Sequence, residues 1–389
     1  MKKLPLNIQT FSDLITENCV YVDKTKNIHY LLTSNKIYFL SRPRRFGKSL
    51  LISTLEAIFQ GRKELFIGLA ISKTDYSWPI HPIIRLDFGL IPHETSQELS
   101  TGLCHELLRI ARLHGATVKK YKNPAQQLQE LVYHLAQKNK VVILIDEYDK
   151  PILDHINNLS TAAKCQQVLR SFYDSIKALD QYCKFVFVTG VSKFAKTSMF
   201  SGFNNLDDLS QHPKAAELLG YTKQEIEDNF SEYLDWAATS MKISHDELMQ
   251  KIAQWYDGYR FTLESEFETE PGNKKVIQKI YSPLSVLKFL DRRYFSNYWF
   301  EKGTPSYLIH MIQGRNLDTS WIDNLSTHET GESVFGSFDL KELPLEALLY
   351  QAGYLTIHSF DQKRKIVKLA YPNLELKDST ESYILTRNR

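Results

Sequence analysis

The chain has 389 residues, of which 43% are hydrophobic and 24% are charged, as in an ordinary globular protein and unlike a disordered or fibrous one. Forty-eight Lys and Arg residues against 45 Asp and Glu residues leave a formal charge of +3. This charge excludes wholesale electrostatic binding to nucleic acid and leaves room only for a local basic patch. No apolar run approaches the about 18 residues that a membrane span needs, and the start of the chain lacks the apolar segment of a signal peptide.

The cysteines are scattered at Cys19, Cys104, Cys165 and Cys183 and form no CxxC pair. This spacing argues against a disulfide framework and against a zinc site. It favours a reducing compartment, and we expect the protein in the cytoplasm without a membrane partner.

The first half of the chain alternates between strand-like and helix-like segments. Short apolar runs predict strands, and apolar residues at helical spacing predict helices. The segments, in chain order, are a strand at 37–40, a helix at 50–59, a strand at 82–88, helices at 97–113 and 125–137, a strand at 141–145, a helix at 161–178 and a strand at 184–189. Strands separated by helices predict βαβ units and a mainly parallel sheet, with the last two strands buried on both faces.

The alternation of strand-like and helix-like segments ends after about residue 215. Thr222 and Glu225 have the spacing of a capping box and predict a helix toward residue 238. Further helices are predicted at 245–256, 283–292 and 342–351, and the polar stretch 264–275 predicts an exposed loop or hairpin tip. We therefore predict two domains, residues 1–215 and a mainly helical lid or C-terminal domain at residues 216–389.

The strongest motif is Arg42-Pro-Arg-Arg-Phe-Gly-Lys-Ser49, which follows a predicted strand and opens a predicted helix. Backbone N–H groups at such a helix N-terminus hold phosphate, and Gly47 permits close approach of the backbone. Lys48 would reach the β and γ phosphates of ATP, and the Ser49 hydroxyl would bind Mg²⁺. Arg42 stands where the standard pattern has Gly. The alternative is a basic turn before a helix.

The second motif lies about a hundred residues further along, where the buried strand VVILI ends in Asp146 and Glu147. Asp146 fits the Walker B role of holding Mg²⁺ through water, and Glu147 fits the base that polarises the attacking water. The alternative is a strand end with two solvated acids.

The exit of the fourth strand carries a third signal, Thr189-Gly-Val-Ser-Lys193. In ATPases with a glutamate beside the Walker B aspartate, a strand between the P-loop and Walker B strands ends in a side chain that senses the γ-phosphate. Thr189 is the first candidate for this sensor and Ser192 the second. The alternative is an ordinary strand terminus.

With these motifs the chain resembles the bacterial AAA-ATPase-like proteins, P-loop ATPases related to the AAA+ and STAND groups. The resemblance runs through segments 21–25, 40–50, 81–88, 145–149, 189–193, 200–206, 255–261, 281–285, 298–305 and 371–373. It implies an α/β P-loop NTPase fold of the ASCE type, ATP and Mg²⁺ as cofactors, and hydrolase activity. An arginine at the first P-loop position is usual in this family, whereas Ser282 departs from its more frequent Asn.

Relatives in this family usually carry a PD-(D/E)XK nuclease-like domain, which would normally begin near Tyr371-Pro-Asn373, where only 16 residues remain. Glu375-Leu-Lys377 has half of the nuclease motif but no matching aspartate strand. We therefore expect residues 1–389 to show no metal-dependent DNA cleavage.

The resemblance also implies weaker site assignments. Asp23 would lie near the nucleotide base, with a helix cap as the alternative. Arg260 would reach the γ-phosphate as a sensor-2-like residue, with a structural turn as the alternative. Arg44 and Arg45 would contact phosphate or an acidic partner, with exposed charge as the alternative. The nucleotide-binding residues are thus predicted to be Asp23, Arg44, Arg45, Phe46, Gly47, Lys48, Ser49, Leu50 and Arg260. For Asp149 we favour a structural role.

These residues predict an ATP-driven switch that acts on a protein partner or effector. The alternatives are a catalytically weak nucleotide-binding scaffold, the ATPase half of a nuclease-associated system that acts on DNA, and a P-loop kinase. Two basic groups are candidates for DNA contact, namely Lys119, Lys120 and Lys122, and Arg292 and Arg293. The alternative is that each group belongs to a solvated helix face. Whether the protein forms an oligomer is left open, because no arginine-finger motif stands out.

Overall fold

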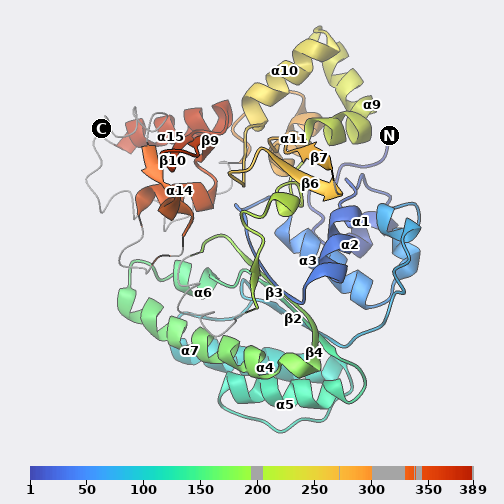
Figure 1. Ribbon diagram of the computed structural model, residues 1–389, viewed down its shortest axis with the longest axis vertical. Coiled ribbons are helices and arrows are strands. Elements are labelled where there is room, and N and C mark those ends of the chain that lie inside the picture. Colours follow the sequence, from blue (N-terminus) through green and yellow to red (C-terminus); the bar gives the residue numbers. More distant parts are fainter. Residues whose placement is uncertain (194–204, 271, 300–328, 337, 339–343, 388–389) are drawn as a thin grey trace.

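A five-stranded parallel sheet forms the centre of the computed structural model, which describes all residues except 194–204, 271, 300–328, 337, 339–343 and 388–389 (Figure 1). The strand order is β2-β3-β4-β1-β5, and each neighbouring pair is parallel. The strands are β1 (Ile37–Ser41), β2 (Ile83–Asp87), β3 (Val141–Asp146), β4 (Cys183–Gly190) and β5 (Asp207–Asp208). The predicted parallel α/β sheet is confirmed, and β1 and β3 are buried along their whole length.

Helices cover the sheet and extend beyond it. They are α1 (Phe11–Thr16), α2 (Thr25–Ser34), α3 (Lys48–Phe59), α4 (Ser96–Leu113), α5 (Pro124–Ala136), α6 (Lys150–Leu153) and α7 (Leu159–Ala178). Helix α3 packs on β2, β3 and β4, whereas α4, α5 and α7 pack against one another at the opposite end of the molecule from α9 and α10 (Lys223–Met241 and His245–Tyr256) (Figure 1). Side chains of Thr95, Asn123 and Asn158 accept backbone N–H groups and so fix where α4, α5 and α7 begin.

The strand register brings the chemical motifs together. Asp87 at the end of β2 pairs with Asp146 at the end of β3, and Leu40 of β1 pairs with Thr189 of β4. The carboxyl ends of these four strands therefore meet at one edge of the sheet, which is where open α/β sheets bind ligands. The position of β4 between β1 and β3 is the one that the sensor-strand hypothesis requires.

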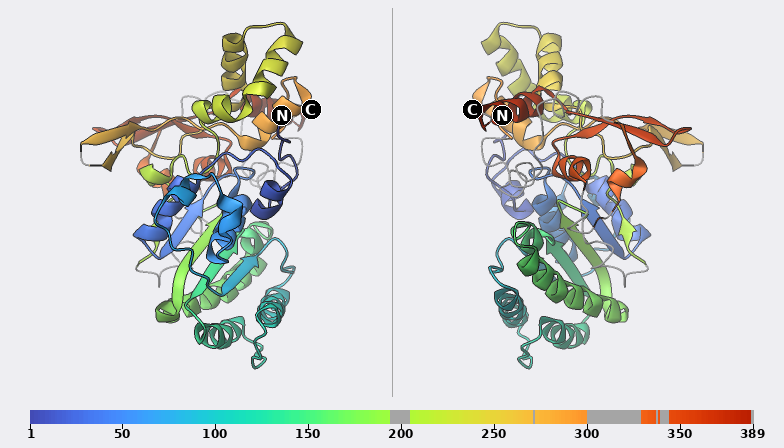
Figure 2. Two further views of the ribbon diagram at one scale, coloured as in Figure 1. Left: turned by 90° about the vertical axis from the view of Figure 1, so that its right-hand side faces the viewer. Right: turned by 90° about the vertical axis from the view of Figure 1, so that its left-hand side faces the viewer.

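The second half contains helices and two antiparallel sheets. Besides α9 and α10, its elements are β6 (Glu266–Glu270), β7 (Asn273–Val276), α11 (Pro283–Arg292), β8 (Glu329–Gly331), α14 (Leu345–Ala352), β9 (Thr356–Asp361), β10 (Ile366–Ala370) and α15 (Leu374–Arg387). Thr222 and Glu225 form the predicted capping box of α9, and β6 and β7 form a hairpin that projects to one side (Figure 2). The three-stranded sheet β8-β10-β9 was not expected, and a mainly helical C-terminal domain is not confirmed.

The apolar core does not stop at residue 215. One cluster of buried side chains joins the parallel sheet to residues of the second half, among them Phe261, Trp299 and Tyr354. A second cluster unites α9, α10 and α11 with Val20 and Val22 from the N-terminal segment. The division into residues 1–215 and 216–389 therefore stays a prediction, and the two halves share a packed interface.

The cysteines are all buried thiols without a disulfide. Among the described residues no helix is both long and apolar enough to cross a bilayer.

Candidate functional site

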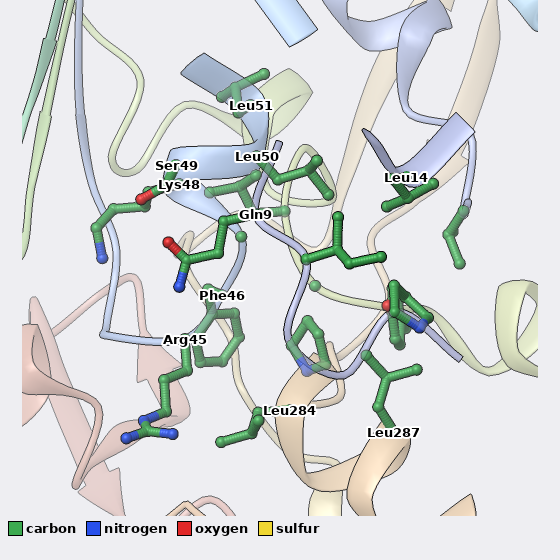
Figure 3. Close-up of a pocket in the computed structure, with 18 of the residues that line it drawn as sticks. Gln9, Leu14, Arg45, Phe46, Lys48, Ser49, Leu50, Leu51, Leu284 and Leu287 are labelled. Carbon is green, nitrogen blue, oxygen red and sulfur yellow. The ribbon is translucent and has the colours of Figure 1, made fainter. Parts of the chain in front are cut away.

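A cavity of about 650 Å³ opens at the carboxyl edge of the parallel sheet. Its walls come from the N-terminal segment 5–9, the segment around Tyr21 and Lys24, the P-loop and start of α3, the end of β3, residues 218–221, and α11. In Figure 3 the Gln9 side chain lies beside Lys48, Ser49 and Phe46 of the P-loop, while Leu14 of α1 and Leu284 and Leu287 of α11 lie further round the wall. The cavity thus combines polar P-loop groups with an apolar wall built partly by the second half.

The P-loop backbone has the conformation that phosphate binding needs. Gly47 precedes α3 with φ 93° and ψ 21°, in the left-handed region that glycine adopts without cost. A Cβ on Gly47 would meet nothing within 4 Å, so the backbone angle alone requires glycine here. Arg45 also has a positive φ of 67°. These turns leave the N-terminus of α3 facing the cavity, where its N–H groups and dipole favour an anion.

Lys48 lies at the centre of this loop. Its Nζ donates to the carbonyl oxygens of Arg42 at 3.0 Å and Pro43 at 2.8 Å. Burial lowers the pKa of Lys48, while the negative charges of Asp146, Asp149 and Glu147 oppose that shift. The ammonium is therefore held inside the loop by neutral carbonyl groups, which a phosphate could replace with stronger, charged partners.

Arg42 occupies the first P-loop position but points away from the cavity. Its guanidinium donates to the carbonyl oxygens of Ser41, Ser210 and Ala215, and its Cζ lies 4.2 Å from the centre of the Phe261 ring. Burial lowers the pKa of this side chain to about 10. The arginine thus joins the P-loop to the segment after β5 and to the second half, which accounts for an arginine where a nucleotide-binding loop ordinarily has glycine.

Carboxylates gather opposite the P-loop. Asp146 is 1% exposed, and its Oδ1 accepts the Glu147 N–H at 3.0 Å. Glu147 has a left-handed φ of 52°, a strained conformation of the kind found at functional sites, and its side chain lines the cavity. Burial and the neighbouring Asp146 raise the pKa of Glu147. Burial likewise raises the pKa of Asp87 beside them.

The oxygen donors at this edge suit Mg²⁺, which prefers carboxylate, hydroxyl, water and phosphate oxygens. Ser49 lines the cavity from α3, whereas Asp146 at the end of β3 is buried and is not among the described residues that line it. No group of three or more His, Cys, Asp or Glu side chains among the described residues could hold a metal by itself. A magnesium ion here would need phosphate oxygens and water in addition to Ser49 and Asp146.

Comparison with known proteins agrees with this geometry. The family described as "Predicted AAA-ATPase" matches residues 5–200, which include the P-loop, the β3 carboxylates and the exit of β4. The chain belongs to the predicted AAA-ATPase family. A relative from Azotobacter chroococcum mcd 1, named "Uncharacterized protein in vnfD 5'region", is 36% identical over 393 residues, covering 99% of this chain and 70% of the relative.

In this predicted AAA-ATPase the two sensor candidates face away from the cavity. The Thr189 hydroxyl donates to the Leu40 carbonyl at 2.9 Å, and the Ser192 hydroxyl donates to Asp149 at 2.6 Å. Both side chains are buried, and neither is among the described residues that line the cavity. The catalytic role of Thr189 stays a prediction, and in this structure its hydroxyl joins β4 to β1.

Asp149 has the structural role that we favoured. Its carboxylate accepts the N–H groups of Val191 and Ser192 as well as the Ser192 hydroxyl, and so fixes the loop after β4. Burial raises the pKa of Asp149. Gly190 permits this packing, because a Cβ there would lie 2.4 Å from Tyr148 and 2.5 Å from Asp149.

Two further predicted nucleotide contacts have backbone partners in this structure. Asp23 accepts the N–H groups of Thr25 and Ala70, so it ties α2 to a short 3-10 turn, as the helix-cap alternative requires. Arg260 donates to the carbonyl oxygens of Thr262 and Leu263 and so holds its own turn. Neither residue is among the described residues that line the cavity. Both side chains instead bind the backbone groups just named.

The other predicted binding residues do line the cavity: Arg44, Arg45, Phe46, Gly47, Lys48, Ser49 and Leu50. Phe46 also packs edge-on against Tyr259 and Phe261, with ring centres 4.7 and 5.4 Å away. The resembling segment 255–261 thus supplies aromatic side chains against which the P-loop packs. Of the resembling segments, 200–206 and 298–305 lie partly outside the described residues.

The sequence did not reveal several residues of the cavity wall. Lys24 lines it and forms a partly buried ion pair with Glu225 of α9, with Nζ 2.6 Å from Oε1. Gln9, Tyr221 and Lys150 also line it. Lys24 lies in the resembling segment 21–25 and Lys150 follows the Walker B acids in the chain, whereas Gln9 and Tyr221 had no signal.

Gly89 provides a test of the Glu147 position. A Cβ on Gly89 would lie 2.7 Å from Glu147 Oε2 and 3.0 Å from Asp87 Oδ1, so both carboxylates must shift in Gly89→Ala. We expect ATP turnover to fall by about tenfold, because small displacements of a catalytic group are costly. Phosphate release measures this effect.

The matched control is Gly331→Ala, because a Cβ there meets no atom closer than 3.6 Å. Thermal unfolding of both variants should stay near that of wild type. Unchanged turnover in Gly89→Ala would mean that the Glu147 carboxylate is not needed where it stands.

Proposed function

We propose that the chain binds ATP with Mg²⁺ in this cavity and hydrolyses it. The observation that carries the proposal is that the α3 N-terminus with Lys48 and the strained Glu147 face one cavity from two neighbouring structural elements. Membership of the predicted AAA-ATPase family suggests nucleotide binding and supports hydrolysis more weakly.

The residues of the site have distinct proposed roles. The N–H groups of the P-loop and Lys48 bind the β and γ phosphates, and Glu147 orients and deprotonates the attacking water. Ser49 and Asp146 hold Mg²⁺, which when bound neutralises charge on the phosphate oxygens. The raised pKa of Glu147 suits a base, since a more basic carboxylate accepts a proton more readily.

We further propose that the nucleotide state acts as a switch on the second half. The support is the close packing of that half on the P-loop. The Trp299 indole donates to the Arg44 carbonyl at 3.3 Å, and Phe46 rests on Tyr259 and Phe261. Gly353 packs on Pro43 so closely that an added Cβ would lie 2.6 Å away. A rearrangement of the loop on hydrolysis would therefore alter these contacts.

Phosphate release from ATP by the purified chain tests the enzymatic proposal. We expect release that depends on Mg²⁺, and parallel assays with and without DNA separate a DNA-acting system from other outputs. Nucleotide binding without turnover would favour the scaffold alternative. Hydrogen exchange with ATP or ADP tests the switch, which predicts different protection at 255–261.

A further inference from the structure

A cluster of charged side chains borders the cavity beside Glu147. Lys150 Nζ lies 2.9 Å from Asp154 Oδ2, and the same oxygen lies 3.1 Å from His93 Nε2. The lysine side chain is 28% exposed and lines the cavity together with Lys48, Ser49 and Glu147. It is therefore a partly exposed cation that borders the site on the side of the Walker B acids.

A backbone hydrogen bond fixes the position of Lys150 next to Glu147. Its N–H donates to the Glu147 carbonyl at 3.0 Å, in the turn between β3 and α6. Its positive charge also lowers the pKa of Glu147, although burial and Asp146 raise that pKa more strongly. Lys150 thus acts electrostatically on the region where an attacking water would lie next to a γ-phosphate.

We propose that Lys150 is a phosphate-contacting residue that leaves Asp154 for a γ-phosphate oxygen when ATP binds, and stabilises the charge of the transition state from within the same chain. This inference rests on the proposed function. In the reaction the water oxygen bonds to the γ-phosphorus while the bond to the ADP oxygen breaks. Glu147 takes the proton of the water, and Lys150 stays protonated throughout.

The hydrogen bond between His93 and Asp154 makes this exchange inexpensive. When Lys150 leaves, Asp154 keeps its hydrogen bond to His93. Burial opposes ionisation of Asp154, yet its hydrogen bonds to His93 and Lys150 lower its pKa to about 2. The bond to Asp154 raises the pKa of His93, and the Ile91 carbonyl holds Nδ1 of the same ring at 2.6 Å. No carboxylate is left without a partner, so the cost of a buried unpaired charge does not arise.

The alternative is that Lys150 only balances the charges of Glu147 and Asp154. The two roles differ in their effect on nucleotides. A γ-phosphate contact affects ATP and its transition state but not ADP, which lacks that phosphate. A purely structural ion pair would change protein stability, or the affinity for ATP and ADP alike.

The test is Lys150→Met with Mg²⁺ and either ATP or ADP. We expect turnover to fall by about a hundredfold, the scale on which one preorganised charge-stabilising group acts. The affinity for ADP should stay within about twofold of wild type, because ADP lacks the γ-phosphate that Lys150 would contact. Lys150→Arg keeps the positive charge and should restore a substantial part of the turnover.

The matched control is Lys251→Met on α10. Lys251 forms the same (i, i+4) type of pair, with Glu247 at 2.9 Å, but is not among the described residues that line the cavity. Turnover of Lys150→Met within about threefold of this control would overturn the proposal for Lys150 while leaving the ATPase intact, and so would equal losses of ATP and ADP affinity. A wild-type chain that binds no nucleotide would instead overturn the proposed function and this inference together.

Discussion

Glu147→Gln is expected to bind ATP with Mg²⁺ as wild type does and to turn it over slower by about two or more orders of magnitude, the scale on which loss of a general base acts. The amide keeps the size of the carboxylate beside Gly89, so the packing of the site is preserved. It cannot accept the proton of the attacking water. Single-turnover phosphate release, with nucleotide binding measured separately, tests this result.

Glu17→Gln is the control for this substitution, because Glu17 is exposed on the surface and is not among the described residues that line the cavity. Normal turnover in Glu147→Gln would place the base on another residue. In that case the raised pKa and strained backbone of Glu147 would need a structural cause.

The second large effect is expected for Lys48→Ala, which should weaken ATP binding about 10- to 100-fold. A hydrogen bond to a charged group contributes about 1.5–3 kcal/mol, and each 1.4 kcal/mol corresponds to a factor of ten. The affected contacts are those that the Lys48 ammonium would make once it exchanges the Arg42 and Pro43 carbonyls for phosphate oxygens. Isothermal calorimetry with ATP and Mg²⁺ measures the loss.

Lys48 is buried, so its removal could also loosen the loop, and thermal unfolding of the variant must be compared with that of wild type. Lys177→Ala on α7 is the control, because that lysine is exposed and is not among the described residues that line the cavity. Undiminished ATP affinity in a folded Lys48→Ala protein would show that the P-loop does not hold the phosphates.

The sequence alone predicted β1 to β4 and the helices α3, α4, α5 and α7, because their signals are local, whereas α1, α2, α6 and β5 were not predicted. An apolar run of strand length predicted β3, and apolar residues at helical spacing after the P-loop motif predicted α3. The capping box of Thr222 and Glu225 predicted the start of α9 for the same reason. The cavity-lining residues of the P-loop follow from the motif, since their backbone geometry lies within eight consecutive positions of the chain.

Only the tertiary structure decided what the remaining polar side chains do, because a side chain binds whichever partner folding brings within reach. Asp23, Thr189 and Arg260 carried motif-like signals, yet each is engaged by backbone groups close to it in space. Lys24 enters the cavity wall beside Glu225, which lies 201 residues away in the chain. Such pairs depend on how separate elements pack, and the local spacing of residues holds no record of that packing.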